Sequence, residues 1–299
     1  MSYKDQYNDS KLFFDELENV SLETINALDK FLPVIGGSSE RLIDAMRYTS
    51  LNGGKCFRPF LFFSSANIFS IPLSKVINIC AAIEMVHCYS LIHDDLPAMD
   101  DDNIRRGKPS CHIAYDEATA ILSGDALLTY AFNIIATSAD ISNIEQRIAL
   151  IISLSDAAGP YGMVGGQMLD LLSKKITPTK EEILRIKELK TSKLISSSCE
   201  MGGIVGNAND KELSALKSFG RDIGIAYQII DDLFDTDINK VSNKSESTLP
   251  VSLVSNYGVV EARKIAEDLV RSATRSIEVF GEKATLLHEA AKFVLERKN

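Results

Sequence analysis

Residues Ser90–Lys108 read SLIHDDLPAMDDDNIRRGK, and the rest of the chain is organised around them. Five aspartates lie between Asp94 and Asp102, and Arg105 and Arg106 follow. An apolar run precedes the acids, so they stand at the end of a buried segment rather than on a solvated tail. Like charges about 4 Å apart repel by about 1 kcal/mol per pair even in water, so folding gathers them only where a cation compensates. Because arginine donates bidentate hydrogen bonds to phosphate, the stretch predicts a magnesium-bridged phosphate site.

The sequence on either side of this stretch is helical in pattern. Apolar residues recur three and four positions apart, whereas alternating β-branched runs between tight turns are almost absent. We therefore predict an all-α fold, a bundle of roughly ten to thirteen helices that forms a single domain over residues 1–299. Polar residues 237–247 predict a loop. The predicted helices cover residues 11–34, 39–51, 60–70, 74–95, 113–138, 143–158, a segment from 165, 179–199, 210–235, 258–280 and 283–297.

Composition excludes several classes of protein. A formal net charge of -9 argues against a general nucleic-acid binder, because the phosphate backbone would be repelled. Five cysteines without a CxxC pair support neither a zinc site nor a disulfide framework, and indicate reduced thiols. The N-terminus lacks the features of a signal peptide, and no apolar run approaches the roughly 18 residues of a membrane span. We expect a soluble, cytoplasmic protein.

A second acid cluster lies at residues 227–235, which read YQIIDDLFD. Asp231 and Asp235 are four positions apart and share a helix face, with Gln228 three positions before Asp231. A solvated helix face is the simpler alternative, but the apolar residues between the acids leave little room for exposure. Helices of a bundle can project acids into one cavity, and Mg²⁺ takes one or two carboxylates plus phosphate oxygens. The two clusters together predict a clamp for a diphosphate held through Mg²⁺.

Other metal-binding patterns fit the first cluster poorly. An EF-hand loop counted from Asp100 would need Gly and Glu where the chain has Arg105 and Cys111. The pair His93-Asp94 could belong to a metal-dependent phosphohydrolase, but such sites need further histidines and the chain has four in all.

A basic turn offers a second place for an anion. Residues 52–59 read NGGKCFRP, so Lys55 and Arg58 follow two glycines whose backbone N–H groups are accessible. An ordinary basic turn is the alternative. His87 lies seven positions before Asp94 and thus on nearly the same helix face, two turns away, although a lone helical histidine is often a core residue.

As a set, these motifs resemble the short-chain trans-prenyl diphosphate synthases, and among them the bacterial farnesyl diphosphate synthases. The resemblance covers about residues 30–297 and implies the isoprenoid synthase fold, a helical bundle around a central cavity. The matching motifs, in the order of the family, are Gly53–Pro59, Glu84–His87, Asp94–Asp100 with Arg105-Arg106, Gly165–Asp170, Lys190-Thr191 and Gln228–Asp235.

The resemblance implies two diphosphate sites and a Mg²⁺ cofactor, with about three ions beside a bound diphosphate. The residues it assigns to metal are Asp94, Asp95, Asp100, Asp231, Asp232 and Asp235. Those it assigns to catalysis are Asp94, Asp95, Asp100, Arg105, Lys190 and Asp231. The residues it assigns to binding of the allylic diphosphate are Arg105, Lys190, Thr191 and Gln228. Those it assigns to binding of isopentenyl diphosphate are Gly54, Lys55, Arg58, His87 and Arg106.

Two further positions follow from the resemblance. Tyr89, five residues before the first acid motif, would form the floor of the product tunnel and limit the product to fifteen carbons. The loop after the second motif is shorter than in the family, and the lysine that closes on the allylic diphosphate has no certain counterpart. Lys244 and Lys240 are the candidates.

The implied reaction condenses dimethylallyl and then geranyl diphosphate with isopentenyl diphosphate, and the resemblance also implies a homodimer. Within the same scaffold, a geranylgeranyl or geranyl diphosphate synthase is the alternative, distinguished by product length. A terpene cyclase would not need the site of Lys55, Arg58 and His87. From a different class, the chain could be a non-catalytic subunit that binds prenyl diphosphates, although such subunits typically lose acids from one motif and here both are complete.

Overall fold

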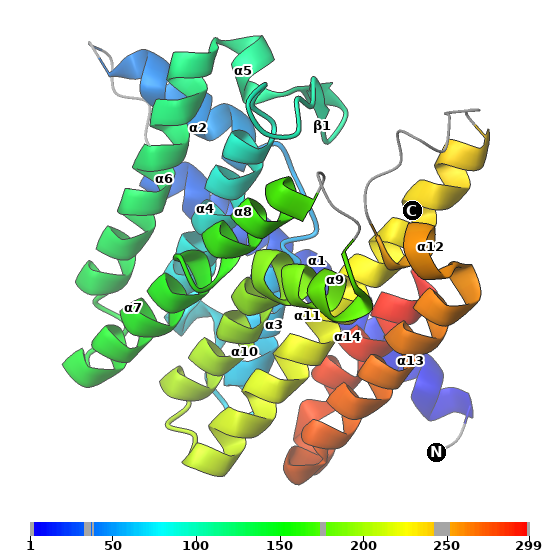
Figure 1. Cartoon of the computed structure of the whole chain (residues 1–299). Coiled ribbons are helices and arrows are strands. Elements are labelled where there is room, and N and C mark those ends of the chain that lie inside the picture. Colours follow the sequence, from blue (N-terminus) through cyan, green and yellow to red (C-terminus); the bar gives the residue numbers. More distant parts are fainter. Residues whose placement is uncertain (1–2, 33–36, 38, 174–177, 242–251, 298–299) are drawn as a thin grey trace. The chain divides into compact units, whose positions relative to one another are not determined.

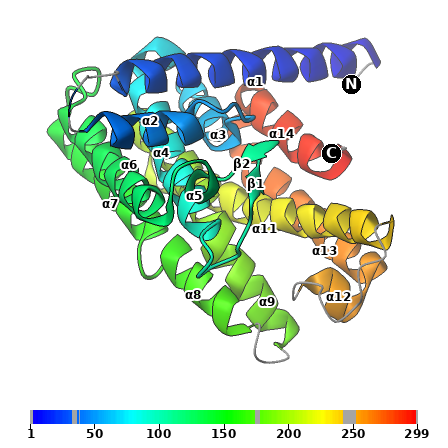
Figure 2. The ribbon, with the colours of Figure 1, turned by 90° about the horizontal axis from the view of Figure 1, so that it is seen from above.

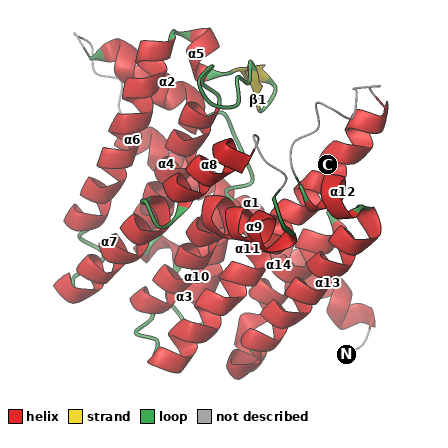
Figure 3. Ribbon diagram, in the orientation of Figure 1, coloured by secondary structure: helices red, strands yellow, loops and turns green. Residues whose placement is uncertain are grey.

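A computed structural model of the chain describes residues 3–32, 37, 39–173, 178–241 and 252–297. Within these ranges, the side chains of residues 3–9 and 235–241 are not described. The described residues form twelve α-helices of eight residues or more, two shorter ones, and one hairpin of two-residue strands (Figure 3). The predicted all-α fold is confirmed.

The chain divides into two compact units. The N-terminal unit comprises residues Phe14–Phe63 and Ile71–Ile151. The C-terminal unit comprises Met1–Phe13, Ser64–Ser70 and Ile152–Asn299. The single domain over residues 1–299 stays a prediction.

The N-terminal unit is built around helix α4 (Ile77–Asp94). Most side chains from Ile79 to Ile92 are buried, as expected of a largely apolar helix in a core. Helix α6 (Glu117–Thr137) packs along α4, and α2 (Glu40–Ser50) packs on both (Figure 2). The unit also holds most of α1 (Tyr3–Phe31), the start of α3 (Phe57–Asn67), η1 (Leu73–Lys75), strands β1 (Ile104–Arg105) and β2 (Lys108–Pro109), α5 (Cys111–Ala114) and the start of α7 (Ile144–Ala158).

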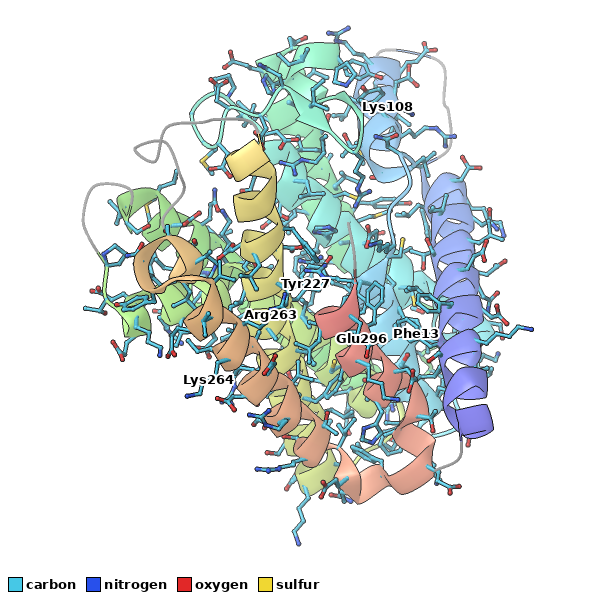
Figure 4. All side chains as sticks on the ribbon, turned by 90° about the vertical axis from the view of Figure 1, so that its right-hand side faces the viewer. Phe13, Lys108, Tyr227, Arg263, Lys264 and Glu296 are labelled. Atoms are coloured by element: carbon cyan, nitrogen blue, oxygen red, sulfur yellow. The ribbon has the colours of Figure 1, made fainter. Side chains whose placement is uncertain are left out.

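The C-terminal unit is built around the long helix α11 (Asp210–Val241). Helices α10 (Lys193–Val205) and α13 (Val259–Ser276) pack along it (Figure 1). At one end, Phe13 of α1 contacts Phe293 of α14 (Thr285–Glu296), with ring centroids 5.4 Å apart (Figure 4). The remaining elements are α8 (Met163–Ser173), α9 (Lys180–Lys187), the π-helix η2 (Glu188–Ser192), α12 (Leu253–Tyr257) and η4 (Glu278–Ala284).

Glycines allow close contacts at the end of α10. A Cβ atom on Gly206 would lie 2.3 Å from the ring of Phe69, and one on Gly203 would lie 2.8 Å from Leu216. These two glycines therefore let α10 pack closely against Phe69 and Leu216.

Three predicted boundaries are wrong. Helix α1 begins at Tyr3 rather than at residue 11. The helix predicted over 179–199 is divided by the π-helix η2 and runs on to Val205. Residues 237–241, predicted as loop, continue α11, because the segment is polar but contains neither proline nor glycine to end a helix. Residues 242–247 lie outside the described residues.

All five cysteines are buried and unpaired, as predicted. Burial raises the pKa of the Cys88 and Cys199 thiols to about 12, so both are protonated at neutral pH.

Two segments, Glu117–Thr137 and Ile144–Ser173, are long and apolar enough to cross a membrane. A core helix of a soluble protein passes the same test. Helix α6 packs against α4, and a turn at residues 159–162 divides the second segment. The expected absence of a membrane span stays a prediction.

Candidate active site

The first acid cluster occupies the carboxyl end of α4. Asp94 is the last residue of the helix and Asp95 its C-cap, where the helix dipole favours cations and disfavours acids. The chain then turns back, and the Asp100 N–H donates to the Asp94 carbonyl at 2.9 Å. Asp94 and Asp100 thus lie next to each other at an unfavourable position for negative charge. This arrangement fits a divalent cation that stabilises both carboxylates.

Asp95 and Asp102 both bond to Arg105. The Asp95 carboxylate is buried and accepts from Arg105 Nε at 3.0 Å and from its Nη2, while Asp102 accepts from Nη2 at 2.9 Å. Burial raises the pKa of Asp95, and the adjacent guanidinium opposes this shift. These two acids therefore orient Arg105, whose remaining donors are available to an anion. A metal-binding role for Asp95 stays a prediction.

Arg106 is presented by the turn of the β1–β2 hairpin. Arg106 and Gly107 form the two-residue loop with φ values of 50° and 75°, as in a type I′ turn. Arg106 Nη1 donates to the Gly53 carbonyl oxygen. A Cβ atom on Gly54 would lie 2.8 Å from the Arg106 Cζ, so the guanidinium packs on a surface that only glycine provides.

Lys55, Arg58 and His87 belong to the same unit. Lys55 is exposed after the glycine turn, Arg58 is half-buried in the first turn of α3, and His87 is half-buried on α4. Burial lowers the pKa of His87, and the positive charges of Arg58 and Arg106 lower it further. The imidazole is therefore neutral at pH 7 and would donate a hydrogen bond to an anion without adding charge.

Tyr89 is buried on α4 and packs edge-on against His93, with ring centroids 5.7 Å apart. Its hydroxyl group has no hydrogen-bond partner among the described residues, and burial raises its pKa to about 12. His93 in turn lies against Gly124 of α6, where an added Cβ would come within 2.1 Å of Nε2. The close approach of α4 and α6 therefore fixes the position of the Tyr89 ring.

In the C-terminal unit, Lys190 lies in the π-helix η2, a form that often marks functional sites. Its Nζ donates to Asp170 of α8 at 2.7 Å. A Cβ on Gly166 would lie 2.2 Å from the Lys190 backbone N, so α8 touches η2 directly. The side-chain amide of Gln167 is buried without a hydrogen-bond partner in the described part of the chain. Such an orphaned buried amide, one residue after the glycine that contacts Lys190, fits a polar ligand.

A hydrogen-bonded chain links η2 to the second acid cluster. Thr191 Oγ1 donates to Gln228 Oε1 at 3.0 Å, and Gln228 Nε2 donates to Asp232 Oδ1 at 3.3 Å. Asp232 also pairs with Lys187, a buried lysine that the sequence reasoning missed. Its only sequence signal is its place three positions before Lys190 on a helix.

Asp231 pairs with Arg297, at 2.6 Å, after the end of α14. The guanidinium is buried over the Tyr227 ring, 3.6 Å from its centroid, and donates to the Tyr227 carbonyl at 2.8 Å. Figure 4 shows Tyr227 on α11 near Glu296, the residue that precedes Arg297. The sequence gives no signal for this contact, because Arg297 follows the last helix without a recognisable motif.

Three predicted positions are not located. Asp235 and Lys240 lie in α11 with side chains that are not described, and Lys244 lies outside the described residues. Where side chains are described, no three His, Cys, Asp or Glu residues form a ready metal-ligand group. A magnesium site of one or two carboxylates with phosphate and water remains compatible with this arrangement.

Comparison with known proteins gives matches over nearly the whole chain. The sequence model of a family described as "Polyprenyl synthetase" matches residues 39–284. The chain is 38% identical over 298 residues to a farnesyl diphosphate synthase of Haemophilus influenzae, covering 96% of this chain and 99% of that protein. It is 35% identical to the farnesyl diphosphate synthase of Escherichia coli, covering 95% and 99%. A crystal structure described as an FPP/GFPP synthase from Zymomonas mobilis matches with a TM-score of 0.89 and 36% identity, covering 96% and 99%.

Proposed function

Because the chain belongs to the polyprenyl synthetase family, we propose that it acts as a farnesyl diphosphate synthase, a trans-prenyltransferase. It joins dimethylallyl diphosphate and then geranyl diphosphate head-to-tail to isopentenyl diphosphate. The observation that carries the proposal is the presence of both aspartate clusters, each next to buried or half-buried cationic side chains. Arg105 in one unit and Lys187 and Lys190 in the other supply these cations.

Mg²⁺ is the cofactor that suits the donor set. Asp94 and Asp100, adjacent at a helix end that disfavours acids, would hold it with Asp95, and Asp231, Asp232 and Asp235 would do so from α11. When bound, the metal neutralises negative charge that develops on the departing diphosphate.

The cationic side chains of the chain bind and orient the two substrates. Arg105, fixed by Asp95 and Asp102, and Lys190, fixed by Asp170, would hold the allylic diphosphate and stabilise it as it leaves. Lys55, Arg58, Arg106 and the neutral His87 would hold isopentenyl diphosphate, so that its double bond attacks the allylic carbon. The proton lost from the product goes to the released diphosphate.

An apolar lining of the tunnel would protect the allylic cation from water. Tyr89, buried on α4, would form the floor of the tunnel for the growing chain and stop elongation at fifteen carbons. Geranyl diphosphate, the product of the first condensation, would then enter the allylic site as the substrate of the second.

We further propose that the protein is a cytoplasmic homodimer that takes no nucleic acid as a partner. The net charge of -9 supports the last point, since it disfavours a polyanion.

The experiment that tests the function uses the purified full chain with Mg²⁺, isopentenyl diphosphate and dimethylallyl diphosphate. After dephosphorylation we expect farnesol as the main alcohol. Geranylgeraniol or geraniol would instead identify the alternative chain lengths on the same scaffold. No alcohol from a folded protein would favour a subunit that binds prenyl diphosphates without catalysis.

A further inference from the structure

Glu84 is an acidic side chain in the apolar core of the N-terminal unit. It lies in the middle of α4, it is 2% exposed, and its neighbours Ile83 and Met85 are fully buried. Neither carboxylate oxygen has a hydrogen-bond partner among the described residues. A buried carboxylate without compensation is strongly unfavourable, so its presence calls for a charge partner or a function.

The partner is the guanidinium of Arg106. Its Nη2 lies 3.6 Å from Glu84 Oε1, which is ion-pair distance but longer than a hydrogen bond. Glu84 is also three residues before His87, so both project from the same face of α4. Burial raises the pKa of Glu84, while the charges of Arg106 and Arg58 lower it, which means that both guanidinium groups act on this carboxylate.

Arg106 is held in a costly backbone conformation. A φ of 50° is unfavourable for a residue with a Cβ, and most two-residue hairpin turns of this kind use Asn or Gly there. A strained backbone conformation persists only where contacts with the surrounding structure hold it, and such positions are often found at functional sites. Here the contacts are the Gly53 carbonyl oxygen, the bare surface of Gly54, and Glu84.

We propose that Glu84 is a positioning residue for isopentenyl diphosphate: its buried carboxylate holds the Arg106 guanidinium in the orientation that receives the diphosphate. The inference rests on the proposed function. Glu84 touches neither substrate in this scheme and acts only through Arg106. The 3.6 Å separation leaves the Nη2 N–H groups available to phosphate oxygens, while the attraction of Glu84, the Nη1 hydrogen bond to Gly53 and the contact with Gly54 together hold the group in place.

The test compares the steady-state kinetics of the full-length wild type with E84Q and E84D. Glutamine keeps the size of the side chain but removes its charge, so we expect the KM for isopentenyl diphosphate to rise about tenfold or more. The KM for geranyl diphosphate and the kcat should change less than about threefold, because the allylic site is left intact. E84D keeps the charge and should recover most of the lost affinity.

A double-mutant cycle identifies the residue through which Glu84 acts. In an R106M background, E84Q should change the KM for isopentenyl diphosphate less than about twofold, because the residue being positioned is gone. An equal effect of E84Q in both backgrounds would show that Glu84 does not act through Arg106 and would overturn the inference.

The matched control is E289Q. Glu289 is also a buried glutamate, 5% exposed, that bonds to Ser10 at 3.0 Å and to Lys292, but it lies in the C-terminal unit. Its substitution should leave both KM values unchanged even if the melting temperature falls. Thermal melts of each variant separate loss of fold from loss of affinity.

The outcomes distinguish the two proposals. A folded wild type that makes no prenyl product refutes the proposed function. An active wild type with unchanged kinetics in E84Q refutes the role of Glu84. Tighter binding of isopentenyl diphosphate by E84Q would also refute it, because it would show that the carboxylate competes with the substrate for Arg106.

Discussion

At the scale of single residues, the carboxylates of the two acid clusters differ in their surroundings. Asp94 and Asp100 are half-exposed at a helix end, whereas Asp95 is buried and bonds to Arg105. On α11, Asp231 and Asp232 each pair with a buried cation. An ion pair of this kind holds the carboxylate in one orientation. The paired cation also competes with any metal ion that binds to the same carboxylate.

Tyr89 can be tested as the floor of the tunnel. Replacing Tyr89 with alanine removes a ring that is 4% exposed, and we expect the main product to lengthen from fifteen to twenty carbons. Tyr89→Phe should leave the product unchanged, because the hydroxyl has no hydrogen-bond partner in the described structure. Chromatography of the dephosphorylated products measures both, and fifteen-carbon product from Tyr89→Ala would contradict the assignment.

Gly54 can be tested through its contact with Arg106. A methyl group at Gly54 would lie 2.8 Å from the Arg106 Cζ and displace the guanidinium, so Gly54→Ala should raise the KM for isopentenyl diphosphate about tenfold. Gly53→Ala is the control, since its φ of 71° is also positive but an added Cβ meets nothing within 4 Å. If the KM for isopentenyl diphosphate rises equally in the two variants, backbone strain and not the contact with Arg106 causes the rise.

At the scale of elements, the start of α6 depends on one exposed acid. Asp116 is the N-cap, and its carboxylate accepts the Thr119 N–H at 2.7 Å and pairs with Arg41 of α2 at 2.6 Å. The Thr119 N–H first, and then Arg41, lower the pKa of Asp116 from 3.8 to about 2.

This shift predicts an acid-dependent loss of stability. Because the pKa is lower in the folded state, the contribution of Asp116 is complete above pH 3.8 and disappears as the pH falls through about 2. Asp116→Asn keeps a capping oxygen that does not titrate, so its free energy of unfolding should decline less than that of the wild type across this range. Urea titrations at several pH values measure the difference, and parallel curves for both proteins would contradict it.

The interruption at η2 is also an effect at the scale of elements. The sequence from Thr179 to Cys199 reads as one helix with acids early and lysines late. In the structure, a π-helix at Glu188–Ser192 shifts the register, and Lys190 then reaches Asp170 while Thr191 reaches Gln228. Gly166 contacts the Lys190 backbone within this π-helix. The periodicity of the sequence does not predict such a contact between two helices.

At the scale of the whole molecule, the prediction concerns assembly. Helix α6 exposes apolar side chains, among them Ile121 at 43% and Leu122 at 58%, which a second copy of the chain would cover. We expect light scattering at micromolar concentration to give twice the chain mass of 32.9 kDa. A mass of one chain in an active preparation would contradict the homodimer and leave the catalytic proposal standing.

The sequence by itself determined the helical class, the two acid clusters and the family. These features depend on residues that are close together in the sequence. Apolar periodicity indicates helices, and clustered acids that would repel one another without a cation indicate a binding site. The predicted helix boundaries are wrong at residues 237–241 and at the start of α1. Both segments are polar, and polarity alone does not end a helix.

Only the tertiary structure decided which charges meet. Arg297 and Asp231 are 66 positions apart, and Glu84 lies on α4 whereas Arg106 lies in the turn of the β1–β2 hairpin, so no spacing rule connects either pair. A buried charge is tolerated only where the packed chain brings a partner to it. That condition depends on the three-dimensional approach of elements, which brings Lys187 to Asp232, Arg297 to Asp231 and Arg106 to Glu84.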